Sequence, residues 1–207
     1  MLPVVDDATL QKALSMIDAE NAGDPAFLRA GAVEGPRERV LSGLVSGWVV
    51  RLRPDPSAAL LLAARGAHLH RWEHPRAEYP AGRAGYLRWR TALYSIQAAH
   101  LGRVLEAAGA DPPTISRATE LVAKRVPRTD PEAQALEDAL CLSFVEADMA
   151  ALSGRTDEAT MTRILRKTWA KMSDAAHELA LTLIQDEGQR RLVERALAGA
   201  PASPSSE

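Results

Sequence analysis

The sequence predicts an all-α fold, with a single compact domain of about eight or nine helices. Apolar residues recur every three or four positions through most of the chain, which is the spacing that lines one face of a helix. No stretch alternates β-branched with polar residues as a half-buried strand does. We therefore expect one helical domain over residues 1–199 and a disordered tail over 200–207, where small and polar residues predominate.

Asp-Pro pairs mark where several helices begin. Aspartate is a preferred N-cap, because its carboxylate accepts hydrogen bonds from the first free N–H groups of a helix. Proline suits the first helical position, where its missing N–H is not needed. The pairs occur at 24–25, 55–56, 111–112 and 130–131, and at least the last three predict helix starts.

The first part of the chain contains three predicted helices. One covers 7–20 and stops at Gly23, and the next begins at Pro36 and ends before Pro54. The third begins at Pro56 and is almost wholly apolar from Ala58 to Ala67. A helix that is apolar on all sides is buried in a core, so we expect the third helix to be central and buried.

The rest of the chain is predicted to be helical almost throughout. The expected helices run from Tyr86 or Thr91 to Ala108, from Pro112 to Val126, from Pro131 to Ala151, from a cap at Thr156, from Ser173, and from Glu187 to Leu197. Prolines and glycines predict that the connector before the fourth helix, over 72–85, is mostly loop. This connector follows the most apolar helix, and loops anchored on a rigid element often carry function.

Composition and charge narrow the functional class. Hydrophobic residues make up 46% and charged residues 25%, as in a soluble globular protein with a core. The formal charge of −2 argues against general binding to nucleic acid or to a membrane surface. No apolar run reaches transmembrane length, and Asp6 and Asp7 stand where a secretory signal would be basic. With Cys141 as the single cysteine, these features predict a cytoplasmic protein without disulfides or membrane contact.

Residues 65–90, named here the Arg/aromatic segment, carry the strongest functional signal. They contain six arginines and two glutamates, a local net charge of +4 with neutral histidines, together with two tryptophans and two tyrosines. Guanidinium groups bind phosphate or carboxylate in bidentate fashion, and aromatic rings provide stacking surfaces. We predict a site for a small anionic ligand; the alternative is that the arginines form ion pairs that tie the connector to the helices. The expected ligand-binding residues are Arg71, Trp72, Arg76, Tyr79 and Arg90.

Three histidines belong to this segment. His68 and His70 would point to different sides of a helix, so they cannot bind one ion unless the helix ends between them. His70 and His74 have helical spacing, but Pro75 interrupts a helix there. We expect His70 and His74 to face solvent, and His68 to form a hydrogen bond at a helix end or to bind a ligand.

Glu137 and Asp138 form an acidic pair inside an otherwise apolar predicted helix. One of the two carboxylates should point inward, where an unpaired charge is costly. It therefore needs a metal ion, an arginine or a histidine as its partner. We predict that Asp138 pairs with Arg71 or His68, which would place the Arg/aromatic segment beside the later helix.

Three strings of residues resemble one known family. They are AHLHRWEHPRAEYPAGRAGYLRWR at 67–90, DPEAQALEDALCLSFVE at 130–146 and ILRKTWAKMSDAAHELAL at 164–181. Over nearly its whole length the chain closely resembles the family named domain of unknown function 4202. The resemblance implies no particular reaction, because the members of that family lack an assigned one.

A further resemblance is to the HD superfamily of helical metal-dependent phosphohydrolases. It lies in the order of AARGAHL at 63–69 and DPEAQALEDA at 130–139. In that superfamily an apolar helix ends in a His-Asp doublet, and a later helix supplies a second Asp. The resemblance implies an HD-like fold in which His68 and Asp138 hold a divalent transition metal such as Mn, Fe or Zn. Such an ion activates water against a phosphoester.

The chain departs from the HD pattern in two places. Leu69 stands where the doublet has Asp, and the helix that begins at Pro36 contains no histidine where an early ligand is expected. A site with two ligands would bind metal weakly. The further candidate ligands are Gln97, His100 and Glu137.

Three functions remain as alternatives. The first is an HD-like, metal-assisted hydrolase of a small phosphorylated or nucleotide-like substrate, with Glu137 or Glu73 as general base; with iron, an oxygenase reaction is an alternative. The second is a non-catalytic module that binds an anionic metabolite, a nucleotide or an RNA end through the Arg/aromatic segment, although nucleic acid is not favoured. The third is a purely structural or partner-binding protein. The sequence names neither the substrate nor the oligomeric state, for which a dimer is one alternative.

Overall fold

The computed structural model describes residues 6–127 and 129–198. Helices form most of these residues, and the one sheet among them is a two-stranded hairpin, so the predicted all-α fold is confirmed. No described helix is both long and apolar enough to cross a membrane. The chain folds into two compact units that divide between Leu136 and Glu137, inside α6 (Pro131–Ala147). The expectation of one domain over 1–199 stays a prediction, and the expected tail over 200–207 lies outside the described residues.

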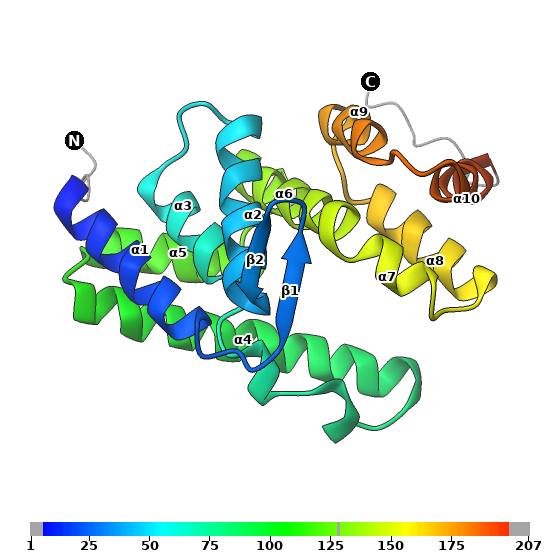
Figure 1. Cartoon of the computed structure of the whole chain (residues 1–207). Helices are drawn as coiled ribbons and strands as arrows, with labels where there is room; N and C mark the ends of the chain where they lie inside the picture. The colour runs from blue at the N-terminus through cyan, green and yellow to red at the C-terminus, as the bar shows by residue number, and fades with distance from the viewer. Residues whose placement is uncertain (1–5, 128, 199–207) are drawn as a thin grey trace. The chain divides into compact units, whose positions relative to one another are not determined.

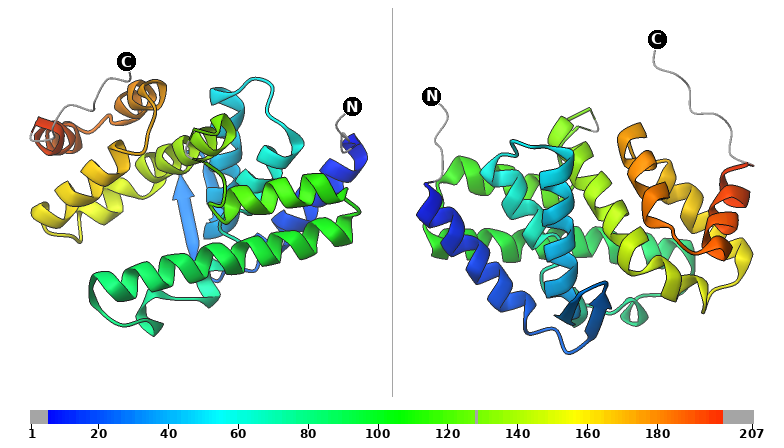
Figure 2. Two further views of the ribbon diagram at one scale, coloured as in Figure 1. Left: turned by 180° about the vertical axis from the view of Figure 1, so that it is seen from behind. Right: turned by 45° about the horizontal axis from the view of Figure 1, so that its top comes forward.

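The N-terminal unit is built around its short, apolar third helix. Leu60 and Leu62 of this helix are fully buried, which confirms the predicted burial. The third helix packs closely against the first, second and fifth, and the long fourth helix lies alongside the first and fifth (Figures 1 and 2). These helices are α1 (Asp7–Asn21), α2 (Arg37–Leu52), α3 (Ala58–Gly66), α4 (Gly82–Ala108) and α5 (Pro112–Val122).

Side-chain caps set several helix starts. Asp111 accepts a hydrogen bond at 3.0 Å from the N–H three residues ahead, and Asp130 accepts bonds at 2.9 and 3.1 Å, so the helix starts predicted at these pairs are confirmed. The start predicted at residues 55–56 is wrong, because α3 begins two residues later. There the Ser57 hydroxyl accepts a hydrogen bond at 3.1 Å from the N–H three residues ahead.

The sequence prediction missed a β-hairpin between α1 and α2. β1 (Phe27–Ala30) pairs antiparallel with β2 (Val33–Pro36), and Gly31 turns between them with a φ of 57°. Both strands are mostly exposed, so no alternating apolar face marks them in the sequence. The buried Asp24 carboxylate ties this hairpin to α2, because it accepts a hydrogen bond at 3.0 Å from the N–H of Glu38.

The connector between α3 and α4 is more ordered than a plain loop. It contains two short 3-10 helices, η1 (Arg71–Glu73) and η2 (Arg76–Glu78). α4 then begins at Gly82, earlier than the predicted starts at Tyr86 or Thr91. Prolines and glycines therefore shortened the predicted helix, although a proline just before a helix and a glycine in its first turn are compatible with it.

Arg76 holds the connector against the start of α4. Its guanidinium donates hydrogen bonds to the carbonyls of Tyr79 and Pro80, both at 2.7 Å, and to that of Gly82 at 3.3 Å. The backbone folds back so tightly that a β-carbon at Gly85 would collide with the Pro80 carbonyl. The connector is thus a defined structure held by an arginine and a glycine.

Up to residue 198, the C-terminal unit contains the rest of α6 and four further helices. These are α7 (Met149–Ser153), α8 (Glu158–Trp169), α9 (Asp174–Leu183) and α10 (Glu187–Ala198). α10 packs on α8, where Arg195 forms an ion pair with Glu158 at 3.0 Å. The Arg166 guanidinium of α8 also donates to the carbonyl of Ala196 at 2.7 Å.

The predicted helix ends in this unit needed two corrections. α6 ends at Ala147 instead of Ala151, because a separate short helix follows it. Asp157, and not Thr156, caps α8: its carboxylate accepts a hydrogen bond at 2.8 Å from the N–H three residues ahead. The predicted start at Ser173 is confirmed, since this residue caps α9.

Candidate functional site

Polar side chains of the N-terminal unit gather in two clusters just after α3. The first cluster pairs His68 with Glu38, which lies in the first turn of α2. Their atoms Nδ1 and Oε2 are 3.2 Å apart. Glu38 is only 3% exposed, so this carboxylate is a charge inside the fold. Its backbone is fixed by Asp24, as described above, which places the first turn of α2 against the end of α3.

The facing atoms of this pair are buried and lack a well-aligned hydrogen bond. Neither Oε2 of Glu38 nor Nδ1 of His68 has a hydrogen-bond partner within the described part of the chain. Burial raises the pKa of Glu38, but the charge of His68, the close polar contact with its ring and the charges of Arg71 and Arg37 outweigh burial and lower the pKa below its usual value. The carboxylate is therefore ionised at neutral pH, in a place where a charge needs a strong partner.

Carboxylate oxygen and imidazole nitrogen are both ligands of divalent transition metals. Two ligand atoms around one ion, each bonded at about 2.1 Å, lie roughly 3.0–3.4 Å apart. The separation of 3.2 Å between Glu38 and His68 falls in that range. The pair could therefore hold an ion without a large rearrangement of either side chain.

The second cluster is centred on His70, which adopts a left-handed backbone conformation with a φ of 55°. Its Nε2 lies 2.8 Å from Oε2 of Glu20 at the end of α1, and its Nδ1 lies 2.7 Å from Oε1 of Glu73. The ring stacks between those of Trp72 and His100, with centroids 5.1 and 4.2 Å away. The expectation that His70 faces solvent is wrong, because tertiary contacts surround it.

The two histidines of this second cluster have opposite charge preferences. Burial lowers the pKa of His70, but its hydrogen bonds to Glu73 and Glu20 outweigh burial and raise it above its usual value. The pKa of His100 is lowered by burial and by the charges of His70 and Arg103. The raised pKa of His70 favours its protonated form, and the lowered pKa of His100 favours its neutral form.

His68 and His70 contact different carboxylates, although not for the reason that helical spacing gave, because both residues lie beyond the end of α3. The last residue of α3 is Gly66, and the left-handed turn at His70 separates the two side chains further. The two clusters share no ligand residue. In the structure His68 meets Glu38, whereas His70 meets Glu20 and Glu73.

The arginines predicted to clamp an anion have partners in the fold. The Arg71 guanidinium lies over the ring of Trp89, 5.7 Å from its centroid. Arg90 donates to the Tyr94 hydroxyl and lies over that ring. Arg76 binds the connector carbonyls described above. An anion site formed by Arg71, Trp72, Arg76, Tyr79 and Arg90 stays a prediction.

The acidic pair of α6 belongs to the C-terminal unit. Glu137 pairs with Lys171 at 3.1 Å. Asp138, 3% exposed, accepts hydrogen bonds from the N–H of Ser173 at 2.8 Å and from its hydroxyl at 2.7 Å, at the start of α9. Its predicted pairing with His68 or Arg71, and the metal site of His68 with Asp138, join residues of different units and stay predictions.

The predicted general bases have defined surroundings. Glu73 accepts a hydrogen bond from His70, which lowers the pKa of its carboxyl and makes it a weaker base. Glu137 is engaged by Lys171. Neither observation tests a role in catalysis, so both assignments stay predictions.

Sequence reasoning missed Glu38 and Glu20. The signal for Glu38 was present, because it stands in the helix where the HD resemblance expects an early ligand, although only a histidine was sought there. No signal in the sequence pointed to Glu20, since its contact with His70 spans 50 residues. His100 was named as a further candidate ligand, and the structure brings it to His70 instead of His68.

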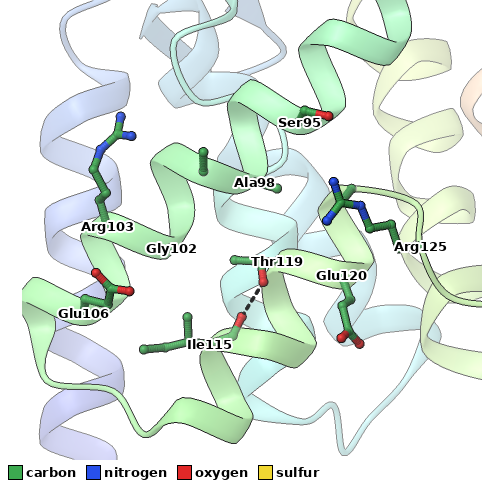
Figure 3. A pocket seen from close by; sticks show the side chains of 11 residues that line it. Ser95, Ala98, Gly102, Arg103, Glu106, Ile115, Thr119, Glu120 and Arg125 are labelled. Atoms are coloured by element: carbon green, nitrogen blue, oxygen red, sulfur yellow. Dashed lines mark hydrogen bonds between the residues drawn. The ribbon is translucent and has the colours of Figure 1, made fainter.

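A groove of about 400 Å³ lies between α4 and α5, and neither histidine of the second cluster lines it (Figure 3). Arg103 and Glu106 line it from α4, and Glu120 and Arg125 from the other side. The Thr119 hydroxyl points back to its own helix, where it donates to a carbonyl. The charges of these two arginines and two glutamates balance, so the lining does not favour an anionic ligand.

Comparison with known proteins yields a family but no reaction. The sequence matches the family described as Domain of unknown function (DUF4202) over residues 11–193. No curated protein and no solved structure matches the chain. The match covers both clusters and the acidic pair of α6.

Proposed function

The chain belongs to the family described as domain of unknown function 4202, and from the geometry of its site we propose that it is a metal-assisted hydrolase. The substrate class is a small phosphorylated or nucleotide-like molecule. The observation that carries the proposal is the Glu38–His68 pair, whose buried ligand atoms are 3.2 Å apart without a well-aligned hydrogen bond. The resemblance to HD phosphohydrolases supports it, with Glu38 in the place of the early ligand.

The donor set fits a divalent transition metal. One ionised carboxylate and one imidazole suit Mn, Fe or Zn better than they suit Mg or Ca, which prefer oxygen ligands. A bound ion would supply an activated water and polarise a phosphoryl oxygen. Glu38 is held in the ionised form that a ligand requires.

Arg71 is the residue that we expect to bind the substrate. The positive charge of Arg71 helps to lower the pKa of the Glu38 carboxyl. A guanidinium that lies over an aromatic ring, as Arg71 does over Trp89, keeps N–H groups for an anion. Those groups can hold two phosphate oxygens in parallel. Arg71 would thereby place a phosphoryl group beside the ion ligands.

Metal content tests the proposal. Protein purified without chelators is analysed for transition metals, beside Glu38→Gln and His68→Ala. We expect each variant to lose about one equivalent of metal and, with added Mn, Fe or Zn, the hydrolysis of a phosphomonoester such as p-nitrophenyl phosphate. Glu34→Gln, the same chemical change on the exposed hairpin, is the control. A metal content that Glu38→Gln leaves unchanged would contradict the proposal.

The HD resemblance also implies Asp138 as a ligand, and its own variant tests this. If Asp138→Asn lowers the metal content as Glu38→Gln does, the ligand set extends to α6. If it leaves the metal content unchanged, Asp138 is not a metal ligand, and its hydrogen bonds to Ser173 are structural. Circular dichroism of both variants checks that the loss of metal is not a loss of fold.

A binding module without catalysis is the second candidate function. Leu69 favours it, because this residue replaces the doublet Asp and is fully buried, where it cannot hold an ion. The module would bind an anionic metabolite, a nucleotide or an RNA end through the Arg/aromatic segment. A thermal-shift screen with such ligands, with and without Mn or Fe, separates the two functions, since bound ligand raises the melting temperature. Shifts that need no metal would favour the module.

A further inference from the structure

A second set of metal-ligating side chains lies in the N-terminal unit, apart from the Glu38–His68 pair. It consists of Glu20 at the end of α1, His70 in the turn after α3, and His100 on α4. One ligand atom from each lies within 4.8 Å of the other two. We propose that these three residues form a second transition-metal site, which ties the Arg/aromatic segment to α1 and α4. This site goes beyond the proposed hydrolase function and does not depend on it.

The donor set selects the kind of ion. Two imidazoles and one carboxylate suit borderline ions such as Zn and Co, whereas Mg and Ca favour oxygen ligands. All three side chains are partly exposed, so an ion can reach them from solvent. Three protein ligands leave a coordination position for water, as in sites that are not closed by a fourth ligand.

Glu73 contacts the ring nitrogen of His70 that does not face Glu20. Its carboxylate lies 2.7 Å from Nδ1 of His70, so it can hold a proton on that nitrogen. The Nε2 atom of His70, which faces Glu20, is then the one that can bind an ion. A carboxylate behind a ligating histidine is a common feature of zinc sites, where it fixes the tautomer and the ring orientation. Glu73 is therefore a positioning residue.

Arg103 competes with the ion. Its guanidinium lies 2.8 Å from Nδ1 of His100. A histidine binds an ion through one ring nitrogen while the other nitrogen carries its proton. Whichever nitrogen of His100 takes the ion, Nδ1 can no longer accept a hydrogen bond from Arg103. Because Arg103 is an exposed side chain, it can turn into solvent at little cost.

Small movements would complete the site. The atoms of His70 and Glu20 that face each other are 2.8 Å apart, slightly less than the roughly 3.0–3.4 Å expected between ligands of one ion. His100 stacks on His70, with ring centroids 4.2 Å apart, so its ring would have to turn to point an in-plane nitrogen to the same ion. The three backbones can stay where the fold places them.

The ion would order the connector. His70 directly precedes η1, which carries Arg71 and Trp72. An ion between His70, α1 and α4 would hold the start of this short helix from two sides. The Arg/aromatic segment would then be more rigid with the metal than without it.

Cobalt binding to the full chain tests the proposal. Chelator-treated protein is titrated with Co²⁺, whose visible absorption reports nitrogen ligands. We expect Glu20→Gln and His100→Asn each to weaken binding at this site more than 100-fold, and Glu73→Gln to weaken it by about 10- to 100-fold. Arg103→Ala should strengthen it several-fold, which a merely structural role of Arg103 does not predict. His74→Asn, the same change on a neighbouring histidine, is the control.

The outcome is separable from that of the hydrolase proposal. The titration is repeated in Glu38→Gln protein, which removes the first site and leaves the second intact. Cobalt absorption that persists there and vanishes in His100→Asn supports the second site. Absorption that Glu20→Gln and His100→Asn leave unchanged, or no binding at all, overturns it and leaves a histidine held between two carboxylates. Circular dichroism of each variant excludes unfolding as the cause, and His100→Asn suffices if Glu20→Gln does not fold.

Discussion

Two histidines only two positions apart meet very different surroundings in the N-terminal unit. His68 faces Glu38, whose side chain is 4% exposed, and the two facing atoms make no hydrogen bond. His70 lies between Glu20 and Glu73, whose side chains are 36% and 47% exposed, and both of its ring nitrogens are within hydrogen-bond distance of a carboxylate. Histidine and glutamate therefore form a buried pair without a well-aligned hydrogen bond in one place, and a partly solvated, hydrogen-bonded cluster in the other. Burial and the number of partners, and not residue type, decide what each histidine can do.

The largest expected effect is a loss of stability when the buried carboxylate of the first cluster is removed. Glu38→Ala should lower the free energy of unfolding by about 3 kcal/mol, because it leaves the neighbouring positive charges without their buried counter-charge. Glu20→Ala should lower it by less than about 1 kcal/mol, because that pair is partly solvated. Urea denaturation of metal-free protein measures both. Equal losses would show that the two clusters do not differ in the way their burial indicates.

A buried carboxylate with good hydrogen bonds provides an intermediate case. Asp138 accepts from the N–H and the hydroxyl of Ser173, so Asp138→Asn should lower the free energy of unfolding by about 2 kcal/mol. Ser173→Ala, which removes only the hydroxyl, should lower it by about half as much. The same denaturation experiment measures both variants. A neutral Asp138→Asn would mean that the hydrogen bonds at the start of α9 do not stabilise the C-terminal unit.

The hydrogen bonds of Arg76 hold the connector in place, and removing them measures how much they stabilise the fold. Because its guanidinium donates to three connector carbonyls, Arg76→Ala should lower the melting temperature, with a loss of about 1–2 kcal/mol. Differential scanning calorimetry gives the value, and Arg83→Ala, on an exposed residue in the first turn of α4, is the control. An unchanged melting temperature would move Arg76 to the ligand-binding role that the sequence predicted.

The smallest expected effect concerns the ion pair of Arg117 with Asp130, which lies outside both clusters and serves as a reference. The hydrogen bond from Arg117 lowers the pKa of Asp130 below its usual 3.8, although burial opposes this. The pair should contribute about 1 kcal/mol of stability above pH 3.8, and this contribution should be lost as the pH falls through the lower pKa of the folded protein. Arg117→Gln should flatten the acid limb of the stability–pH curve. An unchanged acid limb would contradict the prediction.

Local sequence signals predicted the helices well where a side chain caps its own helix. Asp111 and Ser173 mark starts that the structure confirms, because a cap forms within four residues of chain. The same reasoning failed at residues 55–56, where a serine two residues later competes for the cap. It also failed for the hairpin that begins at Phe27, since strands exposed on both faces carry no apolar alternation.

The sequence by itself determined the all-α class, the apolar third helix, the family, and the region in which arginines, histidines and aromatic rings gather. Only the tertiary structure decided which carboxylate each histidine meets. Glu38 reaches His68 because Asp24 fixes the first turn of α2, and Glu20 reaches His70 across 50 residues of chain. Capping and helical periodicity act within a few residues and can be read along the chain. Pairs between distant elements depend on how helices pack and on the left-handed turn at His70, which no local pattern specifies.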